Sequence, residues 1–202
     1  MITSDEEVRE LADRARAHQR IGIDTEFLWE RTYSPLICLV QLNVAGELAI
    51  VDPLEDIDIS PIADLVSDPA VEVVMHAPHA DLVAFVQRLG STPTNIFDTQ
   101  VAAGFAGMSA GLSYERLAQE SIGAKVQPSE SFSDWSRRPL SEKQLRYAAE
   151  DVEHLFDMAD EIRRRLEKFG RTEWAEEELA RRFADMSRIV TPPEEQWRRV
   201  AR

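Results

Sequence analysis

The sequence predicts a mixed α/β fold in which one sheet is covered by helices on both faces. Between residues 21 and 51, three short apolar or alternating segments follow one another with brief connections, as in an antiparallel meander. From about residue 62 onward, helical periodicity alternates with two more short apolar segments, which is typical of parallel strands joined by helices. Together these patterns predict antiparallel strands first and parallel strands afterwards.

Each element has a local signal. Ser4-Asp5-Glu6-Glu7 is a capping box that opens a helix, and Ser141-Glu142-Lys143-Gln144 is a second one. The turn 43–46 ends in glycine and separates the second and third strands. Residues 123–139 are polar, contain two prolines and are expected to form one long irregular connection. We expect strands at about 21–26, 36–42, 47–51, 71–75 and 96–97, and helices at about 4–18, 62–66, 79–89, 99–107, 113–121, 141–168 and 172–184.

Length and composition indicate one domain. A chain of 202 residues with 44% apolar content can bury one core. We expect a domain over residues 1–187 and a tail or linker stub over 188–202. The N-terminus lacks the basic and apolar regions of a secretory signal, and no segment approaches the roughly 18 apolar residues of a membrane span. The single cysteine, Cys38, lies in an apolar run and fits a core residue of a cytoplasmic protein.

The net charge of −14 is unevenly distributed and limits the function. Residues 1–100 hold 6 Lys/Arg and 18 Asp/Glu, whereas residues 101–202 hold 17 and 19. A protein that tracks long nucleic acids normally carries a basic stripe. This balance disfavours such a groove, but it is compatible with an acidic site that grips a few nucleotides through bound cations.

Asp24 and Glu26 are the first candidate site residues. Residues i and i+2 of a strand point to the same face, so both carboxylates project together beside the apolar Ile21 and Ile23. Two such acids repel each other unless a cation lies between them. A polar strand end facing water is the alternative, and it is the commoner one for this pattern alone.

Two further acids lie on expected helices. Tyr147 and Asp151 are four residues apart and therefore neighbours on one helix face. Asp81 falls in the first turn of a helix that follows a buried strand, where it could complement the helix N-terminus or lean toward Asp24. Each signal is weak alone, because a solvated acid on a helix surface is common.

The order of these signals is more specific than any one of them. Asp-x-Glu, an Asp after a strand and turn, and Tyr-x-x-x-Asp on a late helix resemble the three motifs of the DEDD exonuclease superfamily in its tyrosine branch. Within it, the chain resembles ribonuclease D over roughly residues 20–180. The stretches that carry the resemblance are Ile23-Asp24-Thr25-Glu26-Phe27, Thr32-Tyr33-Ser34-Pro35-Leu36-Ile37-Cys38-Leu39-Val40-Gln41, His76-Ala77 with Asp81-Leu82, Phe97-Asp98-Thr99-Gln100 with Ala102-Ala103, Asp134-Trp135 with Arg138-Pro139-Leu140, and Tyr147-Ala148-Ala149 with Asp151-Val152. Pro128 stands where the family commonly has a lysine.

The resemblance implies an RNase H-like sheet and a 3′→5′ exoribonuclease acting on RNA 3′ ends, such as those of transfer-RNA precursors. It implies two divalent cations, Mg²⁺ or Mn²⁺, because the candidate ligands are hard carboxylates. By this analogy Asp24 bridges both ions, Glu26 and Asp151 complete the site of the ion that activates water, and Asp81 holds the second. Tyr147 would orient the attacking water.

Other assignments stay open at this point. Thr25, Phe27 and His76 are candidate substrate-binding residues, although His76 could equally be structural. Arg137, Arg138, Lys143 and Arg146 flank the Tyr147 helix start and are candidates for phosphate contacts. The alternative functions are a DNA exonuclease of the same superfamily, a catalytically silent exonuclease fold that binds RNA, and an acidic domain whose carboxylates are merely solvated. Neither a membrane nor an obligate protein partner is indicated.

Overall fold

The computed structural model describes residues 1–28, 35–127 and 133–184. Eight helices and five strands occur within these ranges. Their bounds are α1 Asp5–His18, β1 Arg20–Leu28, β2 Leu36–Val44, β3 Glu47–Val51, α2 Ser60–Ser67, β4 Glu72–Met75, α3 His79–Leu89, β5 Ile96–Asp98, α4 Thr99–Phe105, α5 Tyr114–Ile122, α6 Glu142–Glu153, α7 Leu155–Phe169 and α8 Thr172–Phe183.

The five strands form one sheet in the order β3-β2-β1-β4-β5. β1 pairs antiparallel with β2, and β2 pairs antiparallel with β3, so the first three strands are the expected meander. β1 also pairs parallel with β4, and β4 pairs parallel with β5. β1 is therefore the central strand at which the pairing changes direction. This arrangement confirms the predicted fold class.

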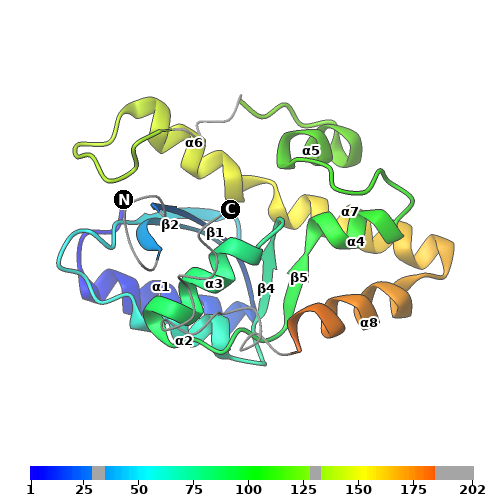
Figure 1. The fold of residues 1–202 in the computed structure, drawn as a ribbon, viewed down its shortest axis with the longest axis horizontal. Coiled ribbons are helices and arrows are strands. Elements are labelled where there is room, and N and C mark those ends of the chain that lie inside the picture. Colours follow the sequence, from blue (N-terminus) through cyan, green and yellow to red (C-terminus); the bar gives the residue numbers. More distant parts are fainter. Residues whose placement is uncertain (29–34, 128–132, 185–202) are drawn as a thin grey trace, which may run out of the picture.

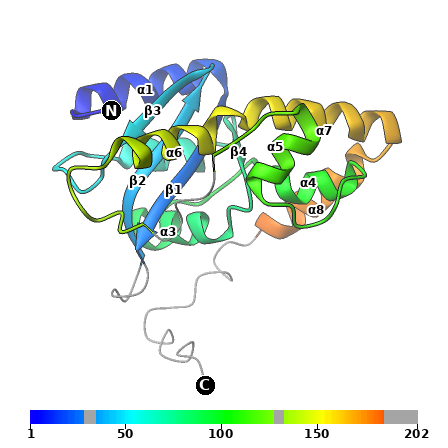
Figure 2. The same ribbon diagram turned by 90° about the horizontal axis from the view of Figure 1, so that it is seen from above.

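Helices cover both faces of the sheet (Figures 1 and 2). On one face, α1, α2 and α3 bury a core that includes Leu11, Ile21, Ile23 and Phe85. On the other face, α6 crosses β1, β2 and β3, while α7 lies over β4. Ile21 and Ile23 are fully buried on the α1 side, so Asp24 and Glu26, which alternate with them, face α6. The hydrophobic pattern of β1 thus decides which face carries the acids.

The prediction of one helix over residues 141–168 was wrong, because the structure has two helices there, α6 and α7. α6 ends at Glu153 and α7 begins at Leu155, with His154 between them at φ −99° and ψ 2°. The capping box at its start is present, because the Ser141 hydroxyl accepts from Gln144 N and the Gln144 side chain accepts from Ser141 N. The break falls three residues after Asp151.

Cys38 is fully buried, as expected of a core residue. Among the residues that the structure describes, no helix combines the length and apolar character needed to cross a membrane. The expected domain boundary at residue 187 lies outside the described residues and stays a prediction. Pro128, which stands where the family commonly has a lysine, also lies outside them.

Candidate active site

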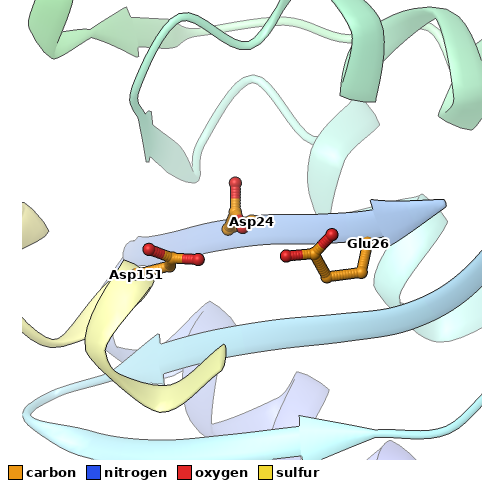
Figure 3. Close-up of side chains that lie close together, drawn as sticks. All are labelled: Asp24, Glu26 and Asp151. Carbon is orange, nitrogen blue, oxygen red and sulfur yellow. The ribbon is translucent and has the colours of Figure 1, made fainter. Parts of the chain in front are cut away.

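Three carboxylates converge on the α6 face of the sheet. Asp24 and Glu26 project from β1, and Asp151 approaches them from the last turn of α6 (Figure 3). Each offers one carboxylate oxygen, and these oxygens all lie within 4.8 Å of one another. The structure therefore brings together acids that are more than a hundred residues apart in the chain.

Asp81 lies at the edge of this cluster, in the first turn of α3. Its Oδ1 accepts a 2.6 Å hydrogen bond from the Thr25 hydroxyl, and both side chains are buried. Asp81 is close enough to raise the pKa of both Asp24 and Glu26 by charge repulsion. Thr25 is thus a contact of Asp81 in this structure, and its candidate role in substrate binding stays a prediction.

Burial and mutual repulsion disfavour the charged forms of the clustered carboxyls. Burial is the largest cause that raises the pKa of Asp24 well above its usual range, followed by repulsion from Asp81, Asp151 and Glu26. Burial, then repulsion from Asp151 and Asp81, raises the pKa of Glu26 to about 8. Burial also raises the pKa of Asp81 to about 6 and that of Asp151 to about 7. Raised pKa values of several acids in one place are typical of a functional site.

The donor set fits a hard divalent cation. Converging carboxylate oxygens are ligands that Mg²⁺ and Mn²⁺ accept, and a cation among them would relieve the burial and repulsion that raise the pKa values. Asp24, Glu26 and Asp151 can hold such an ion between their oxygens, with Asp81 beside them. The geometry is that of a candidate metal centre.

Tyr147 lies one helical turn before Asp151 on the same face of α6. Its side chain makes a hydrogen bond to Asp151, which lowers the pKa of that carboxyl against the effect of burial. The Tyr147 ring also contacts the buried Trp135, with ring centroids 6.0 Å apart. Phe27 lies on the same strand as Glu26 and is half-buried.

His76 is held on both ring nitrogens by the protein. Nδ1 lies 3.0 Å from the Thr99 hydroxyl and Nε2 lies 3.1 Å from the Leu112 carbonyl oxygen. Burial lowers the pKa of His76 to about 4. These contacts are those of a structural residue, and its candidate role in substrate binding stays a prediction.

Arg138 is an internal ion-pair residue in this structure, so its prediction as a phosphate contact was wrong. Its guanidinium pairs with both carboxylate oxygens of the buried Asp52 and also donates to the carbonyl oxygens of Cys38 and Trp135. The donors that a phosphate would need are therefore used inside the protein. Arg138 fastens the segment that carries Trp135 to the sheet, and Trp135 supports Tyr147. The motif that contains Asp134, Trp135 and Arg138 indicated that Arg138 matters in this segment, but the local sequence could not identify Asp52 as its partner.

Residues 1–167 match the 3′–5′ exonuclease family. The chain belongs to this family, and the acids described above lie within the matched range. Ribonuclease D of Granulibacter bethesdensis is 42% identical over 201 residues, which cover 99% of this chain and 51% of that protein. The predicted resemblance to ribonuclease D is confirmed.

Solved structures show the same relationship. The crystal structure of Escherichia coli RNase D, described as an exoribonuclease involved in structured RNA processing, matches with a TM-score of 0.86 and 36% identity over 98% of this chain and 53% of that one. The structure of Brucella melitensis NrnC with bound Mg²⁺ matches with a TM-score of 0.71 and 23% identity over 91% and 86% of the chains, and shares the fold. The expected RNase H-like fold is confirmed. The chain spans about half the length of the ribonucleases D that it matches.

Proposed function

We propose that this chain is the catalytic part of a metal-dependent 3′→5′ exoribonuclease that removes 5′-mononucleotides from RNA 3′ ends with two divalent cations, Mg²⁺ or Mn²⁺. The observation that carries the proposal is the convergence of the half-buried Asp24, Glu26 and Asp151, whose carboxylate oxygens lie within 4.8 Å of one another. The relatives named ribonuclease D support RNA as the substrate class.

The chemistry follows from what each side chain can do. When bound, the cations would polarise the scissile phosphate and lower the pKa of the attacking water. Asp24, Glu26 and Asp151 would hold them, and Thr25 would keep Asp81 oriented toward the same place. A phenol has a usual pKa near 10, so Tyr147 would hold the attacking water by hydrogen bonding and leave proton removal to the metal site.

The acidic balance supports action on the last few nucleotides. With a net charge of −14, the domain has little long-range attraction for a polyanion. RNA grip would then come from the cations at the site, and from basic parts of a longer protein if this chain belongs to one. Transfer-RNA precursors and general RNA 3′ ends are both compatible with such a site.

The test is a digestion of a 5′-labelled unstructured RNA with Mg²⁺ or Mn²⁺. We expect a ladder that shortens from the 3′ end with release of 5′-mononucleotides, and no product in EDTA. Asp24→Asn and Asp151→Asn should each abolish the activity while the fold survives. As a matched control, Asp157→Asn changes an exposed acid on α7 and should leave the ladder unchanged. Full activity in Asp24→Asn or Asp151→Asn would refute the assignment of these carboxylates.

The DNA alternative is settled by the same assay on a DNA oligonucleotide of matched sequence. If the DNA is digested faster than the RNA, the proposed function becomes that of a DNA exonuclease that uses the same site. Absence of digestion of both polymers, with retained binding of RNA, would favour a catalytically silent module.

A further inference from the structure

The break between α6 and α7 lies immediately beyond the candidate metal ligand Asp151. In an uninterrupted α-helix, the backbone N–H of each residue donates to the carbonyl oxygen four residues earlier. The N–H of His154 would then donate to the carbonyl of Glu150. In this structure the two groups are separated, and a side chain from another helix lies between them.

That side chain is Tyr114, the first residue of α5. Its hydroxyl donates a 2.7 Å hydrogen bond to the carbonyl oxygen of Glu150 and accepts a 3.1 Å hydrogen bond from the backbone N–H of His154. A side chain inserted into the helical hydrogen-bond ladder is a recognised cause of a helix bend. Tyr114 thus satisfies both backbone groups that the break leaves without their helical partners.

A second side chain holds the junction from the sheet. The Asn43 amide nitrogen on β2 donates to the carbonyl oxygens of Val152 and Glu153, at 3.1 and 3.3 Å. Both carbonyls lie in the last turn of α6, where the His154 N–H also turns back to the Val152 carbonyl oxygen. The start of α7 and Asn43 both lie close to Gly22 of β1. A Cβ at Gly22 would lie 3.2 Å from both Asn43 Cβ and Leu155 Cδ1, so a larger residue there would crowd the junction.

The position of Tyr114 is itself fixed. Its ring stands edge-on to the ring of His76, with centroids 5.8 Å apart and planes at 82°. His76 is held by Thr99 and by the carbonyl of Leu112, which lies two residues before Tyr114. These contacts restrict the orientations open to the Tyr114 side chain, so its hydroxyl is held in place as a positioning contact requires.

We propose that Tyr114 and Asn43 are positioning residues, which grip the α6–α7 junction from two sides and thereby set the Asp151 carboxylate against Asp24 and Glu26 for metal binding. Asp151 lies between the two gripped stretches: the Glu150 carbonyl precedes it, and the Val152 and Glu153 carbonyls follow it. The inference rests on the proposed function for the metal, but the grip itself is a property of the backbone around Asp151. Supports of this kind typically contribute 10- to 100-fold to metal affinity.

The test compares Mn²⁺ affinity by titration calorimetry in the purified wild-type chain and in Tyr114→Phe, which keeps the ring on His76 and removes only the hydroxyl. We expect Mn²⁺ affinity to fall by roughly 10-fold or more. At a fixed subsaturating Mn²⁺ concentration, kcat for RNA digestion should fall while KM for RNA stays unchanged. Ser121→Ala is the matched control, because it removes another hydroxyl of α5 that bonds a backbone carbonyl, that of Leu117, away from the junction.

The outcomes are separable. Equal Mn²⁺ affinity in wild type and Tyr114→Phe, or an equal loss in Ser121→Ala, would overturn the inference even if RNA digestion is present. A wild-type chain that neither binds Mn²⁺ nor digests RNA would overturn the proposed function and the inference with it. If Tyr114→Phe does not fold by circular dichroism, Asn43→Ala decides by the same titration: a loss of roughly 10-fold supports the grip, and unchanged affinity contradicts it.

Discussion

The Thr25 hydroxyl donates a 2.6 Å hydrogen bond to Oδ1 of Asp81 and so ties the central strand to the first turn of α3. This bond lowers the pKa of Asp81, whereas burial raises it, and the net result is a pKa of about 6. Thr25 therefore supports Asp81 on α3, while its neighbours Asp24 and Glu26 are themselves members of the carboxylate cluster.

Thr25→Val should weaken metal binding in a pH-dependent way. Valine keeps the shape of threonine and removes the donor, so the pKa of Asp81 should rise further above about 6. Mn²⁺ affinity by calorimetry should then fall at pH 6.5 and approach the wild-type value at pH 8.5, where Asp81 ionises in both proteins. Thr94→Val is the control, because the Thr94 hydroxyl is buried without a hydrogen-bond partner among the described residues. A loss of the same size at both pH values would contradict this role.

The metal-free protein should lose stability as the pH rises from 6.5 to 9. Its folded state holds protons on Glu26 and Asp151 up to pKa values of about 8 and 7, whereas unfolded carboxyls release them near pH 4. Stability from a raised pKa is lost as the pH rises through the folded value. His76, with its pKa lowered to about 4, acts in the opposite direction only below about pH 6.5, outside this window.

The measurement is urea unfolding in EDTA at pH 6.5 and pH 9. We expect the free energy of unfolding to fall by on the order of 2 kcal/mol over this range. Glu26→Gln should make the pH dependence distinctly shallower, and saturating Mg²⁺ should remove it in the wild type. A free energy that stays constant or rises with pH in EDTA would show that these carboxyls are not held protonated.

Tyr147→Phe should reduce turnover and leave metal binding largely intact. The variant keeps the ring contact with Trp135 and removes the hydroxyl that hydrogen-bonds Asp151. Loss of a water-orienting group should lower kcat by about 10²-fold, while Mn²⁺ affinity at pH 8.5 stays close to that of wild type. Unchanged turnover would remove the water-orienting role from Tyr147, and a parallel loss of Mn²⁺ affinity would make it a support of Asp151 instead.

The sequence predicted those parts of the fold that have local signals. Alternation along β1 showed that Asp24 and Glu26 share a face opposite Ile23, because a strand has a period of two. Capping residues placed the starts of α1 and α6. The order of acids along the chain predicted a common site, although only the structure shows the three carboxylates meeting.

What the sequence did not predict depends on partners far along the chain. Helical periodicity continues through His154, so nothing local predicted a break there. The break depends on Tyr114, forty residues away, whose hydroxyl replaces a backbone partner. Arg138 was predicted to contact phosphate because no partner for it is visible in the local sequence. Its partner Asp52 is 86 residues away along the chain. The sequence placed Asn43 in the turn 43–46, where an asparagine is ordinary, whereas the structure places it in β2 and buries it. Its apolar neighbours Leu42 and Val44 were the signal that the amide lies in the strand and needs a hydrogen-bond partner.

The most direct test of the account is a crystal structure of the chain soaked with Mn²⁺ and a mononucleotide, with data collected at the manganese absorption edge. We expect two anomalous peaks beside Asp24, with carboxylate oxygens of Asp24, Glu26 and Asp151 directly coordinating manganese and Asp81 near the second ion. Under Mn²⁺ concentrations that sustain RNA digestion, a map without a peak among these three carboxylates would contradict the central claim.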